Sequence, residues 1–339
     1  MSLRVRSWVL PLLLCLGCTA KPAPADEKKD APEAKAAEVK TDDATPPADE
    51  RKDEPAVGNT KRIEIVSAEP PEITVLEVGT DPRELRLNPV VGETEMMKMT
   101  MTMDMTMAPM PAISMPPMVT SMSGVATEVT DERIKATMKF ESITIEPKSD
   151  TPQMLVDQLK QTLDGFESFE SAVELDKRGT LLGGHSDVPQ GLPGPVQQTM
   201  NQMQESFGKL QVPLPEEAVG LGGKWKAVSN VEQGGMKLEQ TATYEVLSFE
   251  GDDIELKVDI EQKLVSKEFE PPGMPGVKGS IERYSGGGSG TLALKLDKLT
   301  PTRSDMTVDV DMKMTVSAMG QDQTQEMTMK MDIDLVRAE

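Results

Sequence analysis

Apolar and polar residues alternate with a period of two along most of the chain from residue 62 onward. The clearest stretch is 97–107, where every odd position is Met and the even positions are Lys, Thr or Asp. Similar alternation, with Met, Val, Ile or Leu at every second position, recurs in segments 254–260, 292–296, 306–316 and 327–335. Because successive side chains of a strand point to opposite faces, these segments predict antiparallel strands with one buried and one solvated face.

Departures from this alternation predict where strands bend and where helices interrupt them. The parity of the apolar positions changes between Phe140 and Ile143, which indicates a β-bulge. Segments 151–165 and 195–207 instead carry apolar residues three or four positions apart, so we expect a helix in each. The first of these begins with Thr and Pro, which suit the cap and the first position of a helix.

Three stretches are expected to be loops. Residues 285–290 are Ser-Gly-Gly-Gly-Ser-Gly and predict a flexible connection before the next strand. Residues 107–118 are apolar and rich in Pro, and they predict an exposed loop. This loop either contacts membrane, a partner or a cavity mouth, or folds onto the body as a hairpin tip. The Gly-rich segment around His185 is also expected to be a loop.

The pattern contains about ten or more strands and two helices. An open flat sheet with that many strands is unusual. We therefore expect a mainly β fold with two helices: one large curved antiparallel sheet, or half-barrel, with the helices packed on its concave side. Trp225 stands just inside the start of a strand, and we expect it to pack in the core.

The N-terminal residues predict export. Two arginines precede a short apolar run that ends at Cys18, as in a secretory signal peptide. A Cys directly after Leu-Gly resembles a bacterial lipobox, so we predict that residues 1–17 are a lipoprotein signal peptide and that Cys18 is lipidated. Cys15 departs from the Leu usual at that position, and ordinary signal cleavage near residues 19–20 is the alternative.

Composition divides the remaining chain into a tether and a domain. Residues 18–60 begin with the lipidated Cys and are dominated by Ala, Pro, Lys, Asp and Glu, which predicts a disordered linker. Residues 61–339 are expected to form a single β-rich domain. The lipid anchor makes the membrane the first partner. Thr19 rather than Asp follows the anchor, which favours the outer membrane, with the protein facing the periplasm.

Charge and residue counts exclude several kinds of function. The formal net charge of −21 argues against binding nucleic acid or anionic lipid by charge attraction. The two cysteines precede the predicted domain, and His185 is the one histidine. A histidine zinc site, a Ser-His-Asp triad or a Cys-His dyad needs more partners than that. We therefore predict a non-enzymatic protein with no catalytic residues, no metal and no cofactor.

The chain has 25 Met but only 3% aromatic residues, and this imbalance allows three interpretations. Met is flexible and polarizable, so a Met-lined concave sheet suits an adaptable apolar ligand. The same residues could equally fill a core beneath the helices. Thioethers are also ligands for Cu(I), although the stripes contain no His or Cys and continue into Val and Ile. The candidate lining residues are Met99, Met101, Met103, Met105, Met312, Met314, Met329 and Met331.

The element Leu-Pro…Val-Gly-x-Gly-x-x-Trp, here residues 214–225, completes a set of features shared with a known group of proteins. The chain resembles a family of bacterial, myxobacterial-type lipoproteins that have a lipobox, an acidic Pro/Ala linker and strands alternating Met with Thr or Asp. The resemblance implies no particular activity and no catalytic residues. It implies an architecture similar to that of the periplasmic lipid-carrier lipoproteins, whose half-barrels hold acyl chains.

Together these observations predict a lipid-anchored cell-envelope protein that binds a hydrophobic, lipid-like ligand on a Met-lined concave sheet. The alternative is a structural or protein-interaction lipoprotein with a filled core and no ligand, and copper binding by Met is less favoured. The residues identify no protein partner.

Overall fold

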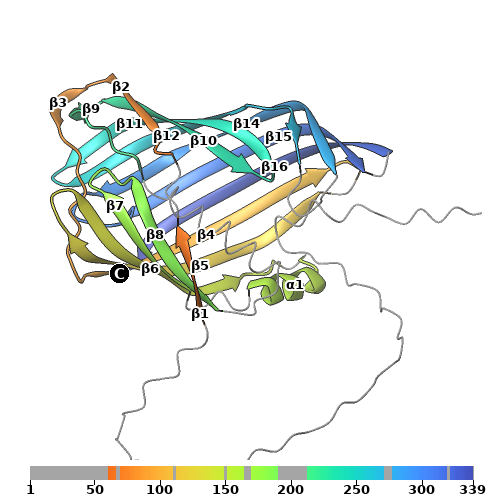
Figure 1. The fold of residues 1–339 in the computed structure, drawn as a ribbon, viewed down its shortest axis with the longest axis horizontal. Helices are drawn as coiled ribbons and strands as arrows, with labels where there is room; N and C mark the ends of the chain where they lie inside the picture. The colour runs from red at the N-terminus through yellow and green to blue at the C-terminus, as the bar shows by residue number, and fades with distance from the viewer. Residues whose placement is uncertain are drawn as a thin grey trace, which may run out of the picture.

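The computed structural model describes residues 60–65, 69–109, 112–148, 151–163, 169–189, 212–270, 277–318 and 321–338 (Figure 1). These ranges form strands β1–β16 and one helix, α1. The bounds are β1 Thr60–Ile65, β2 Glu72–Glu77, β3 Thr80–Arg83, β4 Thr94–Met107, β5 Ile113–Val129, β6 Arg133–Ile145, α1 Gln153–Leu163, β7 Glu170–Asp176, β8 Leu181–Pro189, β9 Val219–Leu221, β10 Lys224–Gln233, β11 Met236–Glu250, β12 Asp253–Leu264, β13 Glu268–Phe269, β14 Lys278–Lys295, β15 Arg303–Ala318 and β16 Gln321–Ala338.

Fourteen of these strands form one antiparallel sheet. Its order is β1-β8-β7-β6-β5-β4-β16-β15-β14-β12-β11-β10-β2, with β13 paired to β14, while β3 and β9 form a separate two-stranded sheet. The sheet curves strongly but does not close, and β1 and β2 are its two edges (Figure 1). The predicted fold class, a large curved antiparallel sheet, is therefore confirmed.

The buried side chains identify the concave face. One apolar cluster contains Val173 of β7 and Val258 of β12, which belong to strands far apart in the sheet order. Side chains from the same face can meet in this way only if the sheet curls around them. The edge strands are joined through residues 66–71, so Ile65 and Glu72 lie no more than about 25 Å apart.

The predicted alternation sets the two faces of the central strands. Opposite residues on β4 and β16 include Met103 with Met331 and Met105 with Met329, and their side chains share the concave face. The predicted bulge is also present, because the pairing of β5 with β6 shifts register between Ser121 and Met122, opposite residues 140–142. Trp225 is fully buried at the start of β10, as predicted.

The prediction that residues 285–290 form a flexible loop is wrong, because they lie in the middle of β14 and pair with β12 and β15. Close backbone approach explains the glycines. A Cβ added at Gly290 would lie 2.0 Å from the carbonyl oxygen of Asp305, and one at Gly287 would lie 2.7 Å from that of Ile260. These positions therefore accept only glycine without a backbone shift.

Two other loop predictions are also corrected. The exposed loop expected over 107–118 is shorter, because β5 begins at Ile113 and buries Met115 and Pro116. His185 lies in β8 rather than in a loop, paired with Glu64 of β1.

The first predicted helix is α1. It buries Val156 and Leu159 and packs beside β6, at the lower margin of the sheet in Figure 1. The second predicted helix, 195–207, lies outside the described residues. Across the residues that the structure covers, no helix is both long and apolar enough to cross a membrane.

Candidate functional site on the concave face

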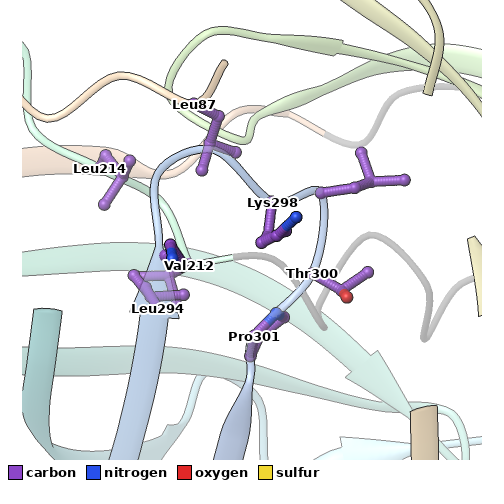
Figure 2. A pocket seen from close by; sticks show the side chains of 9 residues that line it. Leu87, Val212, Leu214, Leu294, Lys298, Thr300 and Pro301 are labelled. Carbon is purple, nitrogen blue, oxygen red and sulfur yellow. The ribbon is translucent and has the colours of Figure 1, made fainter. Parts of the chain in front are cut away.

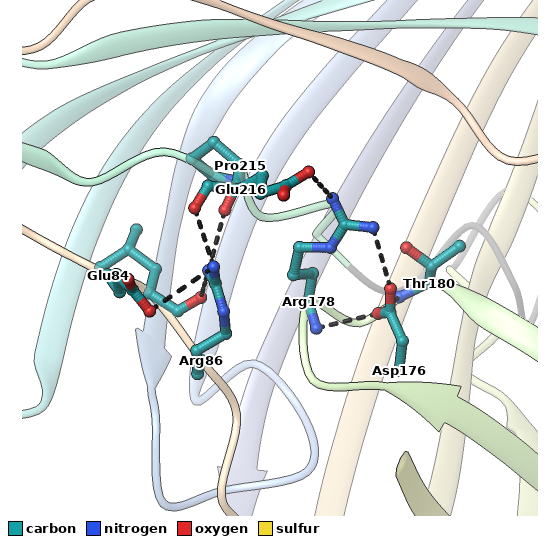
Figure 3. Close-up of polar contacts among 8 residues, drawn as sticks. Glu84, Arg86, Asp176, Arg178, Thr180, Pro215 and Glu216 are labelled. Atoms are coloured by element: carbon teal, nitrogen blue, oxygen red, sulfur yellow. Dashed lines mark hydrogen bonds and ion pairs between the residues drawn. The ribbon is translucent and has the colours of Figure 1, made fainter. Parts of the chain in front are cut away.

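One end of the curved sheet is covered by four crossing segments, and polar contacts link three of them (Figure 3). Arg86 donates from Nη1 to the carbonyl oxygen of Pro215 at 3.0 Å and from Nη2 to that of Glu216 at 2.8 Å. The Arg178 guanidinium lies 3.8 Å from the Glu216 carboxylate, and the Arg178 backbone N–H donates to Asp176 at 2.8 Å. We call this region the closed end; it comprises residues 84–92, 176–180, 212–219 and 296–301.

The closed end is tightly packed inside. Leu85, Leu214, Leu299 and Trp225 are all buried, and the Trp225 ring stacks on Tyr244 at a centroid distance of 5.2 Å. The cavity among these segments measures about 10 Å³, which is about the space that one water needs (Figure 2). A ligand of lipid size therefore has no room at this end.

A buried carboxylate anchors one of the crossing segments. Glu95 of β4 is 2% exposed, because it lies on the same concave face as the methionines that follow it. It accepts hydrogen bonds from the backbone N–H groups of Leu299 and Thr300 at 2.8 and 3.2 Å, and from the Thr300 hydroxyl at 2.9 Å. At the surface nearby, Lys298 donates to both oxygens of Glu93 at 2.6 Å.

A second buried cluster lies toward the other end of the sheet. It contains Phe269, Ile281, Met312 and Met314, with Tyr284 among the partly buried residues around it. Between the two clusters, six half-buried apolar residues of β4, β15 and β16 share the concave face and belong to neither cluster. We call them the open band; they are Met101, Met103, Val308, Met329, Met331 and Ile333.

The strand registers make the open band continuous. Met331 of β16 pairs with Met103 of β4 on one side and with Val308 of β15 on the other. Ile333 likewise pairs with Met101. Gly288 of β14 lies next to Val308 and offers no side chain, so the band continues into bare backbone on that side. The result is an apolar surface that spans three central strands and is covered by neither cluster.

The eight methionines predicted to line a ligand site all lie on the concave face, but they divide into three groups. Met101, Met103, Met329 and Met331 lie in the open band, Met99 and Met105 border it, and Met312 and Met314 are buried in the second cluster. The structure thus brings most of the predicted residues together and assigns two of them to a filled core.

Charge is segregated between the two faces of the central strands. On β4, β16, β15, β14 and β12, the concave positions alongside the open band carry no charged side chain. The convex positions of the same strands carry Lys, Asp and Glu, as in the cross-sheet row of Glu261, Gly287, Asp309, Lys330 and Asp104. The concave surface therefore suits an uncharged, apolar group.

Sequence reasoning missed a polar row on the concave face. The Tyr284 hydroxyl donates to Oε1 of Gln262 at 2.6 Å, and Nε2 of Gln262 donates to Oε1 of Gln240 at 3.0 Å. Burial raises the pKa of Tyr284, so its hydroxyl stays protonated as a donor. The signal was present in the sequence, because Gln262 stands at the parity of the apolar residues of β12.

A depression of about 680 Å³ lies around residues 285–289, and its lining is chemically mixed. Its lining combines charged convex-face side chains, those of Glu261, Asp309, Asp311 and Lys330, with the apolar concave-face residues Ile260, Val310 and Met329. The missing side chains of the Gly tract create this hollow. An apolar ligand would meet carboxylates on the convex side of this hollow, so we assign the ligand to the concave face alone.

The described residues offer little for catalysis or metal binding. Ser171 and Ser186 share a hydrogen bond of 2.6 Å and are both fully buried, while His185, one position along β8, points to the other face. No group of three or more His, Cys, Asp or Glu in the described ranges is placed to hold a metal ion. Cys18, the predicted lipidation site, lies outside those ranges.

Comparison with known proteins adds no family. The chain matches no protein-family model, and it matches no curated protein.

Proposed function

We propose that this protein is a non-enzymatic, lipid-anchored component of the cell envelope that binds a hydrophobic, lipid-like ligand on the open band. Cys18 carries the anchor, and residues 18–60 tether the domain to the outer membrane on its periplasmic side. The ligand is held by Met and Val side chains rather than by a metal or a cofactor.

The single observation that carries this proposal is the half-buried state of the open band. Apolar strand faces in soluble proteins normally pack into a core, and a contiguous exposed apolar surface often marks a binding site. Here Met103, Val308 and Met331 lie side by side between two packed clusters without joining either. Met is also the side chain that best adapts its shape to different apolar partners.

The second candidate is a structural or protein-interaction lipoprotein with a filled core. The packed closed end, with its cavity of about 10 Å³, favours this reading for that part of the molecule. A filled core over the whole sheet would require another segment to cover the open band, and the predicted helix 195–207 is the candidate, although it lies outside the described residues. Copper binding by the Met stripes would place soft sulfur ligands on the same face, and it is the least favoured of the three.

Native mass spectrometry with lipid extraction separates these candidates. Every described element lies between Thr60 and Ala338, so a chain of residues 18–339 carrying Cys18→Ser keeps them all. This chain is expressed in a bacterial host and purified without detergent. We expect a co-purifying lipid at close to one per chain. A ligand-free mass that persists after incubation with phospholipids and fatty acids would contradict the proposal and support a filled core without a ligand.

A matched pair of variants tests the location. Met331→Lys places a charge in the open band, whereas Thr328→Lys makes the same charge change on the exposed convex face opposite Asp311. We expect Met331→Lys to lower lipid occupancy at least about tenfold, which corresponds to about 1.4 kcal/mol. Thr328→Lys should retain its lipid. Equal occupancy in both variants would place the ligand elsewhere.

A further inference from the structure

The open band continues into polar side chains along one row of the sheet. Reading across β16, β15, β14, β12 and β11, the opposite concave residues are Met329, Val310, Gly286, Gln262 and Gln240. The row is thus apolar on one half and amide-bearing on the other. Gly286 separates the two halves.

The glycine between the two halves makes room for the Tyr284 hydroxyl beside the amides. A Cβ at Gly286 would lie 2.5 Å from the Tyr284 hydroxyl and 2.7 Å from Oε1 of Gln262. The absence of that Cβ lets Tyr284 lean over the row and donate to Gln262. The hydroxyl and the two amides therefore form one chain of hydrogen bonds that ends at Gln240.

The outer end of this chain has unused hydrogen-bonding capacity. Gln240 accepts from Gln262 through Oε1, and its own Nε2 donates to no other described residue. Ser229 of β10 lies opposite Gln240 and is half-buried, and its hydroxyl is likewise unpaired within the described ranges. Polar groups that are partly withdrawn from water gain from a ligand that can both donate and accept.

The same surface offers nothing to a charged head group. No concave position of the row carries a charge, and the convex side chains of the same strands are of both signs, including Glu261, Asp309 and Lys330. The chain as a whole has a net charge of −21. An anion there would lose water without gaining a countercharge, and the field of the protein would repel it.

We propose that the ligand is an uncharged amphiphile with a hydroxyl- or amide-bearing head, as in a monoacylglycerol, whose head binds Gln240 and Gln262 and whose acyl chain lies on the open band. This inference rests on the proposed function, because it names the chemistry of the ligand for the same surface. It predicts that a lipid with a neutral head group binds more tightly than a fatty acid or an acidic phospholipid with the same acyl chain.

Competition between matched lipids tests it. The chain of residues 18–339 carrying Cys18→Ser is stripped of lipid and titrated at pH 8 with monomyristoylglycerol and with myristate, which share an acyl chain and differ in head-group charge. Displacement of a fluorescent lipid gives both affinities. We expect monomyristoylglycerol to bind at least about tenfold more tightly. Equal affinities, or tighter binding of myristate, would overturn the inference while leaving the proposed function intact, and no binding of either lipid would overturn both.

Variants locate the head group. Gln262→Leu should weaken monomyristoylglycerol about tenfold and leave myristate unchanged, so that the preference disappears. Gln240→Leu, which retains the bond between Tyr284 and Gln262, should have the same effect and serves if Gln262→Leu fails to fold. Gln323→Leu makes the same substitution at an exposed position of β16 and should keep the preference. A preference that survives both Gln240→Leu and Gln262→Leu would contradict the assigned head-group site.

Discussion

Replacing Glu95 with alanine should destabilise the domain through the closed end. The carboxylate is 2% exposed and accepts two backbone hydrogen bonds and one hydroxyl hydrogen bond from Leu299 and Thr300. In Glu95→Ala the two backbone N–H groups lose their partner inside the packed closed end. The Thr300 hydroxyl can rotate, so it contributes less to the loss.

The size of the effect follows mainly from the two backbone hydrogen bonds. A buried donor left without a partner costs about 1–3 kcal/mol, so the two backbone groups together cost about 2–6 kcal/mol. Removing a buried carboxylate also relieves part of its own desolvation penalty, which offsets some of this loss. We therefore expect the free energy of unfolding to fall by about 2–4 kcal/mol.

Urea unfolding followed by the fluorescence of Trp225 measures this change, because Trp225 is buried against Tyr244 at the same end. The control is Glu255→Ala on the convex face of β12, where the side chain is exposed and the expected change is within about 0.5 kcal/mol. Equal unfolding midpoints for the two variants would refute the view that Glu95 holds the crossing segment in place.

Three further predictions concern the sheet and its titration. Gly290→Ala should destabilise the domain by about 1–3 kcal/mol in urea unfolding, because its Cβ would meet a backbone oxygen, whereas Ser289→Ala on the exposed convex side should be neutral. The hydrogen bond from Lys298 holds the pKa of Glu93 below its ordinary value of 4.5. The stability that the Glu93 carboxylate contributes should therefore be present above pH 4.5 and be lost as the pH falls through the lowered pKa. In Glu93→Gln, the free energy of unfolding measured against pH should fall less steeply in this acid range. Burial raises the pKa of Tyr244 to about 12, so stability should fall between pH 10 and about 12, and the tyrosinate absorbance should appear in that range rather than at pH 10.

Local alternation was sufficient to predict which face of each central strand is apolar. The Met positions of β4 and the Met and Val positions of β15 and β16 share the concave face because side-chain direction in a strand depends on parity alone. The same rule flags Glu95 and Gln262 as polar residues at inward positions. Their partners could not be inferred, because those partners come from loops and strands whose placement depends on the whole sheet.

The pairing between strands that are distant in the chain could not be predicted from the sequence. The chain brings β4 beside β16, so the first long strand pairs with the last and completes the middle of the sheet. The prediction of a loop at the Gly tract of β14 was wrong for a related reason. Glycine raises the flexibility of an isolated chain, but here it allows three backbones to approach closely. The closed end was equally hidden, because Arg86 contacts Pro215 and Glu216 across more than a hundred residues of sequence.

Methyl NMR of the methionines tests whether the open band binds the lipid. The chain of residues 18–339 carrying Cys18→Ser, with its Met methyl groups labelled, is titrated with monomyristoylglycerol, and single Met→Leu variants assign the signals. We predict that the signals of Met101, Met103, Met329 and Met331 shift, while those of Met97 and Met122, which are buried toward the closed end, stay in place. Shifts confined to methionines outside the open band, or no shift at saturating lipid, would contradict this prediction.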